Sequence, residues 1–162
     1  MTFGEAVKSC FHNYASFKGR AGRSEYWFFA LFVLLISIVV EVSVVLFDQS
    51  TVTVSGIVTV SGIVTGLFFF LPSQAVCVRR LHDVGKSGKI LLVYYLLSLL
   101  TAVIGSLYAA GRMGGAAVII LVFLCIGLLV MGVMLFVFVC RDSDSGENEY
   151  GPNPKSLPKA LK

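Results

Sequence analysis

Four long apolar runs decide what this chain can fold into. They cover about residues 26–47, 54–78, 90–108 and 116–140, and Glu41 is the only charged residue inside them. Each run has roughly the 20 residues that a helix needs to cross the hydrocarbon layer of a membrane. Hydrophobic residues make up 57% of the 162 residues and charged residues 14%, and a soluble protein of this size could not bury so much apolar surface. The sequence therefore predicts an integral membrane protein with four spans.

The predicted fold class is all-α, a four-helix transmembrane bundle. Helices are expected because an open sheet would leave backbone groups without partners in lipid. The second span contains a tandem repeat, in which residues 52–57 and 58–63 both read VTVSGI. Its β-branched residues would suit a strand in water, but lipid favours the internal hydrogen bonds of a helix. Pro72 is expected to disturb the end of this helix, where Ser73 and Gln74 are expected to satisfy the backbone groups that it frees.

The Lys and Arg residues are distributed unequally between the segments outside the spans. Twelve of the 13 precede the first span, follow the second or follow the fourth, and only Arg112 lies elsewhere. The positive-inside rule therefore predicts that both termini and the central loop are cytoplasmic. The net charge of +4 follows from this asymmetry, and no basic soluble module is present to bind nucleic acid. The first apolar run begins about 25 residues into the chain, so it is interpreted as an uncleaved anchor.

The chain is expected to be a single domain over residues 1–162. Its two terminal segments differ, because the first is amphipathic and the second is polar. Five apolar residues at helical spacing predict a short amphipathic N-terminal helix: Phe3, Val7, Cys10, Phe11 and Tyr14. This helix is expected either to lie in the membrane interface or to pack onto the ends of the spans. The tail, residues 141–162, is polar and rich in turn-forming residues, so it is predicted to be flexible.

Three motifs occur in order outside the spans. They read FKGRA-x-RSEYW at residues 17–27, RRLHD-x-G-x-SG at residues 79–88 and GEN-x-YG-x-NP at residues 146–154. Together they resemble the YhaH-like family of small bacterial inner-membrane proteins, catalogued as domain of unknown function 805, over nearly the whole chain. The resemblance implies a multi-pass protein of the bacterial inner (plasma) membrane with four helices. It implies no activity, substrate or catalytic residue.

Nine polar residues of these motifs are predicted to converge into one cluster at the cytoplasmic face. Two roles stay open for them. Five are candidates for binding an anion, because cations dominate the set: Arg20, Arg23, Arg79, Arg80 and His82. Four are candidates for a structural role: Glu25, Asp83, Asn148 and Tyr150. In the structural alternative, Arg23 or Arg79 pairs with Glu25 or Asp83 and locks the ends of the helices together.

Enzymatic, metal and cofactor chemistry find little support. The four cysteines lack the spacing of a zinc or redox site, and hydrolase motifs are absent. Gly85-Lys86-Ser87 is not the end of a P-loop, because Arg80 stands where the first glycine is required. His82 and Asp83 are adjacent in the sequence, and adjacent residues seldom face each other as a catalytic pair. We therefore expect no catalytic residue, metal or cofactor, and a protein that is not an enzyme.

Glu41 is the one acidic residue well inside a span, which makes it a functional candidate. It is expected to pair with Arg112 or to reach water at the outer interface. Three functions follow from these observations. The first is a non-enzymatic interaction or scaffold protein that binds anionic lipid headgroups, a membrane-protein partner or a second copy of itself. The alternative is a small transporter or transporter subunit that uses Glu41, and the third is a membrane enzyme acting on a phosphorylated lipid.

Overall fold

The computed structural model describes residues 1–47 and 51–155, with side chains at all of these positions except 45, 47 and 51–57. Lys159, Lys162 and the rest of the predicted flexible tail beyond residue 155 lie outside the described residues. The regular structure within these ranges is helical and comprises α1 (Phe3–His12), α2 (Arg23–Phe47), α3 (Thr51–Asp83), α4 (Lys89–Ala109) and α5 (Ala116–Cys140). The prediction of an all-helical chain is confirmed.

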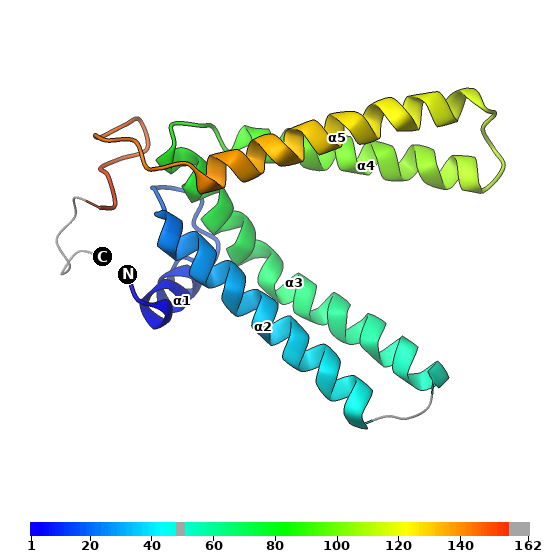
Figure 1. Ribbon diagram of the computed structural model, residues 1–162, viewed down its shortest axis with the longest axis horizontal. Helices are drawn as coiled ribbons and strands as arrows, with labels where there is room; N and C mark the ends of the chain where they lie inside the picture. Colours follow the sequence, from blue (N-terminus) through cyan, green and yellow to red (C-terminus); the bar gives the residue numbers. More distant parts are fainter. Residues whose placement is uncertain (48–50, 156–162) are drawn as a thin grey trace.

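The four long helices form two hairpins that meet at one end and diverge toward the other. Helices α2 and α3 make one hairpin, and α4 and α5 make the second (Figure 1). The N-terminus and the part of the tail up to residue 155 lie where the hairpins meet. We call this the convergent end, and it comprises α1, residues 13–22, residues 84–88 and residues 141–155, together with the adjoining ends of α2 to α5. Beyond it the two hairpins diverge in Figure 1, so the molecule has the outline of a V.

Helices α2 to α5 are long and apolar enough to cross a membrane. Their outward side chains stay exposed, with Leu99 at 62%, Phe123 at 71% and Leu129 at 67% of their full accessible surface. An apolar surface of this extent is stable only in contact with lipid or another protein. The prediction of four membrane-length helices is confirmed.

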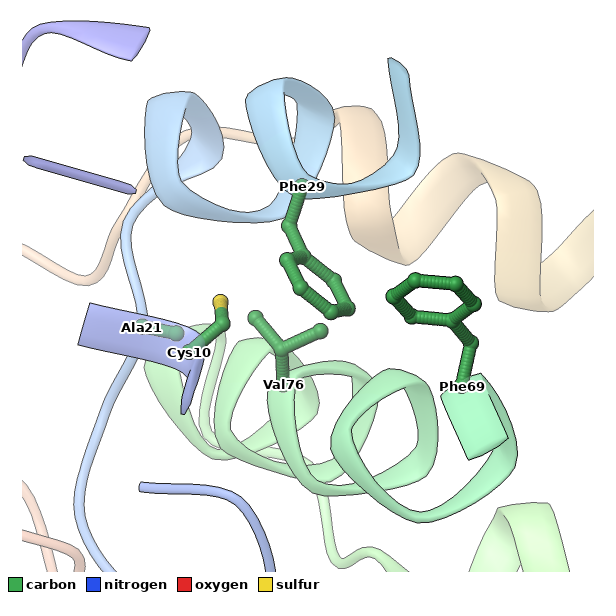
Figure 2. Packing of buried hydrophobic residues seen from close by; sticks show 5 residues of the cluster. All are labelled: Cys10, Ala21, Phe29, Phe69 and Val76. Carbon is green, nitrogen blue, oxygen red and sulfur yellow. The ribbon is translucent and has the colours of Figure 1, made fainter. Parts of the chain in front are cut away.

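Helix α1 packs onto α2 and α3, which was one of the two arrangements expected for it. The helix begins with a capping box, in which Thr2 accepts from the Glu5 amide and Glu5 accepts from the Thr2 amide. Its apolar face joins a buried cluster of Cys10, Ala21, Phe29, Phe69 and Val76 (Figure 2). The ring of Phe11 lies 5.9 Å from that of Phe29, edge to face. The convergent end thus has a small hydrophobic core of its own.

Helix α3 continues past the end of the predicted span and includes the start of the segment expected to be a loop. It ends at Asp83, so Arg79, Arg80 and His82 lie on its last turns. Gly85 ends the helix in a left-handed conformation with φ +66°, and the Lys86 amide donates to the Leu81 carbonyl at 2.9 Å. This is the usual hydrogen-bond pattern of a glycine-terminated helix.

Pro72 lies inside α3, and the backbone group that it frees is satisfied by a residue of the loop after α1. Because proline has no N–H, the carbonyl of Phe68 loses its helical donor. The hydroxyl of Tyr14 donates to this carbonyl at 2.5 Å. Ser73 and Gln74 were expected to do this, and the structure assigns it to Tyr14 instead. The sequence separation of 54 residues explains why local reasoning missed it.

Gly88 marks the closest approach between α3 and the start of α4. A Cβ added at Gly88 would lie 2.6 Å from Cγ1 of Val78, whose branched side chain cannot turn away easily. We expect Gly88→Ala to lower the free energy of unfolding by about 1–3 kcal/mol, measured by thermal unfolding in detergent. Gly115 is the matched control, because it precedes α5 with similar backbone angles and meets nothing within 4 Å. Equal stability of Gly88→Ala and Gly115→Ala would contradict the close packing described here.

Candidate functional site

Asp83 is the centre of a buried ionic network at the convergent end. Its Oδ1 accepts from Nε of Arg20 at 3.0 Å, and its Oδ2 accepts from Nη1 of Arg80 and from the hydroxyl of Ser143 at 2.6 Å. The carbonyl of Asp83 also accepts from the Asp144 amide at 3.0 Å. The Asp83 side chain is completely buried. One carboxylate therefore joins the loop after α1, the end of α3 and the tail.

Arg20 uses its whole guanidinium in the structure. Besides the bond to Asp83, it donates to the carbonyls of Gly146, Gly151 and Asp144 at 2.7–3.1 Å, and to the carbonyl of Asp83 at 3.3 Å. These contacts occupy all five N–H groups, and the side chain is 1% exposed. Arg20 holds the tail in place and has no free donor for a ligand.

Arg80 is equally engaged. Nε donates to the Val139 carbonyl at 3.1 Å, Nη1 pairs with Asp83, and Nη2 donates to the Arg141 carbonyl. These two carbonyls belong to the end of α5, which lacks helical donors for its last carbonyls. The fully buried Arg80 side chain thus satisfies that helix end and joins the two hairpins.

His82 and the tail residues Asn148 and Tyr150 form a second set of contacts. The ring of Tyr150 stacks on that of His82 with centroids 3.8 Å apart and planes 5° from parallel. Nδ1 of His82 lies 3.2 Å from the Gly19 carbonyl, and the Asn148 amide donates to the His82 carbonyl at 3.0 Å. These three residues therefore dock the tail onto α3.

Glu25 and Arg79 form a separate buried pair beside α1. Nη1 of Arg79 donates to Oε1 of Glu25 at 2.8 Å, and the Ser9 hydroxyl donates to the same oxygen at 3.0 Å. Both charged side chains are at least nine-tenths buried. Burial, with Glu25 nearby, raises the pKa of the Cys10 thiol to about 12, so this thiol stays neutral at physiological pH.

Arg79 differs from Arg20 and Arg80 because part of its guanidinium is unused. Its Nε and Nη2 atoms are buried and have no hydrogen-bond partner among the described residues. Arg79 lines a cavity of about 530 Å³ between α1, the start of α2 and the tail. Four further Lys and Arg residues line this cavity: Arg20 is buried and fully paired, whereas Lys18, Arg23 and Lys155 are exposed. Glu25 is the only acidic residue among its lining residues, and Arg79 already balances that charge.

The Asp83 network lies within residues 14–152, which match a known family, and the cavity extends beyond this range at Ser9 and Lys155. The family described as "Protein of unknown function (DUF805)" matches residues 14–152. The chain belongs to the DUF805 family. It is similar to inner membrane protein YhaI of Escherichia coli strain K12, at 29% identity over 147 residues covering 91% of this chain and 92% of that protein. It is also similar to inner membrane protein YhaH of that strain, at 30% identity over 146 residues covering 90% and 93%. No solved structure matches the chain. With its four apolar helices, this DUF805 protein is therefore integral to a membrane.

The predicted site residues thus take different positions in this DUF805 protein. Arg20, Arg80 and Asp83 share one network, and Glu25 and Arg79 form the second. Arg23 was expected to pair with Glu25 or Asp83, but it lies on the surface, 3.3 Å from Asp142, and both side chains are largely exposed. Arg23 is the first residue of α2 and lines the cavity from its exposed side, where water reaches it.

Sequence reasoning missed several residues that complete the site. Ser9, Ser143 and Asp144 supply contacts to the ionic networks, and Lys18 and Lys155 line the cavity. Ser9 could have been found from its position three residues after buried Ala6, which places the two residues side by side on α1. The tail residues carry no periodic signal, because their backbone forms no regular element. Only contacts between distant segments reveal them.

Glu41 lies apart from these residues, on α2 in the DUF805 fold. A Cβ at Gly62 of α3 would be 3.2 Å from its Oε1, and its Oε2 is buried with no hydrogen-bond partner in the described part of the chain. Pairing with Arg112 was expected, but Arg112 follows α4, at the far end of the other hairpin, and the hairpins diverge (Figure 1). Glu41 faces the glycine of its own hairpin instead. Its role in transport stays a prediction.

Metal binding has no visible basis in the DUF805 residues that the structure describes. No group of three or more His, Cys, Asp or Glu side chains could hold a metal ion among them. Cys10, Cys77, Cys125 and Cys140 are free thiols.

Proposed function

We propose that this protein is a non-enzymatic interaction protein of the inner membrane whose convergent end is cytoplasmic and binds the phosphate group of an anionic lipid. The observation that carries the proposal is Arg79. Its buried Nε and Nη2 have no hydrogen-bond partner among the described residues, and Arg79 is one of the residues that line the cavity. Leaving such donors unsatisfied costs free energy, and a charged acceptor recovers it.

The charge of the cavity favours an anion. Glu25 and Arg79 cancel each other, and Arg20 is neutralised by Asp83 and backbone carbonyls. Lys18, Arg23 and Lys155 remain around the opening, with Asp142 as the acidic neighbour of Arg23 and Lys155. Arginine and lysine donors around a concave site match the geometry of a phosphate.

The surroundings of the cavity favour a lipid over a soluble anion. Phe17 and Trp27 flank the cavity-lining segment 18–25 in the sequence, and they are 40% and 41% exposed. Exposed aromatic side chains next to basic ones are typical of the headgroup region of a membrane. This arrangement, and the excess of Lys and Arg at this end, support a cavity within reach of headgroups of the cytoplasmic leaflet.

A non-enzymatic role follows from the state of the polar groups beside the cavity. The hydroxyl of Ser9 donates to Glu25, and Glu25 is paired with Arg79. The Cys10 thiol has a pKa of about 12, so it is a poor nucleophile. We propose that these groups hold the arginine in position for binding.

Neutralising the cations at the opening tests the proposal. In the triple variant Lys18→Gln/Arg23→Gln/Lys155→Gln, we expect affinity for phosphatidylglycerol to fall roughly tenfold or more, because each lost cation weakens attraction to phosphate. Native mass spectrometry of detergent-purified protein, titrated separately with phosphatidylglycerol, phosphatidylcholine and inorganic phosphate, measures binding and distinguishes a lipid from a soluble anion.

The control variant removes the same amount of charge elsewhere. Lys8, Lys89 and Arg112 are exposed and do not line the cavity, so Lys8→Gln/Lys89→Gln/Arg112→Gln is expected to bind like the wild type. If both triple variants bound phosphatidylglycerol equally weakly, net charge alone would explain the lost affinity, and a defined site would be refuted. Preference for inorganic phosphate over phosphatidylglycerol would refute the lipid.

A further inference from the structure

A second pocket lies where the two hairpins separate, on the membrane side of the convergent end. It has a volume of about 220 Å³ and is lined by residues of α2, α3 and α4. Phe29 and Leu91 contribute apolar surface, and no charged residue lines it. It is separate from the 530 Å³ cavity lined by Arg79, because the two have no lining residue in common. Both are lined in part by residues of α2.

Polar groups with unused hydrogen-bonding capacity also line this pocket. The Tyr95 hydroxyl donates to Oε1 of Gln74 at 2.8 Å and links α4 to α3. The amide nitrogen of Gln74 and the hydroxyls of Tyr26 and Ser73 have no partner among the described residues. Three donors around an apolar pocket require an acceptor, because water is scarce at membrane depth.

The depth of the pocket identifies the acceptor. Tyr95 follows Lys89, the first residue of α4, by six residues, which is roughly 9 Å at helical rise. Tyr26 is the fourth residue of α2, so it lies roughly 5 Å from the start of that helix. This range lies below the headgroups and at the edge of the hydrocarbon. The lipid groups found there are the ester carbonyls of the glycerol backbone, which accept hydrogen bonds and carry no charge.

We infer that this pocket binds one ester-linked phospholipid, with Tyr26, Ser73 and Gln74 donating to its two ester carbonyls and an acyl chain running between the two hairpins. The volume is smaller than the 300–1,000 Å³ typical of a site for a whole small molecule, so it fits the ester and the first part of one chain. The rest of the acyl chain would lie between the diverging hairpins, in the opening of the V that Figure 1 shows. The headgroup is not selected here, because the pocket offers no charge.

The test compares two phosphatidylcholines that differ only in ester or ether linkage. Purified wild-type protein, stripped of lipid and titrated with each in native mass spectrometry, is expected to prefer the diester lipid by about tenfold, because the ether lacks the carbonyl acceptor. Tyr26→Phe keeps the ring and removes one donor, so the preference should fall about three- to tenfold. Tyr94→Phe is the control, since Tyr94 lies on α4 and does not line the pocket.

A second pair of variants fills the space and does not depend on the hydroxyls. Ala30 lines the pocket, whereas its neighbour Leu31 is 44% exposed on the outside of α2. Ala30→Phe is expected to lower retention of the diester lipid at least tenfold, and Leu31→Phe to leave it unchanged. The same affinity for diester and diether lipid, or full retention by Ala30→Phe, would overturn the inference. So would a wild-type dimer that binds no lipid, because a second copy would then occupy the opening.

Discussion

Replacing Asp83 with alanine is expected to destabilise the protein by about 3–5 kcal/mol, because the substitution leaves two buried arginines without their anion. Arg20 and Arg80 both donate to Asp83, and all three side chains are almost completely buried. Ser143 loses its acceptor as well. Unfolding in mixtures of SDS and mild detergent measures the change.

The same substitution should release the tail. Limited proteolysis is expected to cut residues 141–155 faster in Asp83→Ala than in the wild type, because Asp83 holds this segment through Ser143 and Arg20. Asp142→Ala is the control. Asp142 belongs to the same tail and pairs with Arg23 and Lys155, but these pairs are exposed and screened by water. Wild-type stability of Asp83→Ala would show that the network does not hold the hairpins together.

Exchanging the Glu25–Arg79 pair for apolar residues separates folding from binding. Glu25→Leu alone is expected to cost about 3–5 kcal/mol, because Arg79 becomes a buried charge without a partner. Adding Arg79→Met should restore most of the loss, since apolar replacements of a buried ion pair are often neutral or stabilising. Unfolding in mixtures of SDS and mild detergent, as for Asp83→Ala, measures both changes in stability.

The double variant also tests the role of Arg79 in anion binding. It should fold like the wild type and yet bind phosphatidylglycerol at least tenfold more weakly, because the unpartnered Nε and Nη2 donors are gone. The phospholipid of the second pocket should be retained, since neither residue lines it. A stable double variant with undiminished phosphatidylglycerol binding would remove Arg79 from the proposed site. A double variant as unstable as Glu25→Leu would mean that Ser9 and the cavity, rather than the ion pair, set the stability.

The four membrane-length helices were predictable, because the cost of unsatisfied backbone groups in lipid leaves long uncharged runs no alternative. Their arrangement was not. Helix α5 is apolar on every side, so it carries no stripe that would show which neighbour it packs against. Lipid and protein offer such a helix similar surroundings, and the divergence of the hairpins follows from contacts concentrated at one end.

The convergent-end residues were predictable as a group but not as pairs. The positive-inside pattern and the three motifs place Arg79, Glu25 and Asp83 near one another, and the Arg79–Glu25 pair was among those considered. The partners of Arg20 and Arg80 include backbone carbonyls of Gly146, Gly151 and Val139. Carbonyls carry no sequence signal, since every residue has one. The exposed position of Arg23 likewise depends on where the tail lies.

The hydrogen bonds from Arg20 to carbonyls of the tail bear on the order in which the protein assembles in the membrane. A ribosome makes Arg20 and Asp83 long before residues 144–151, whose carbonyls fill the Arg20 guanidinium. Each hairpin can enter the bilayer as soon as its two helices are made, since lipid satisfies their apolar surfaces. The contacts between Arg20 and the tail, by contrast, form only after residues 144–151 emerge. Membrane insertion and the docking of residues 144–151 are therefore separate events, because this segment is made after all four membrane-length helices.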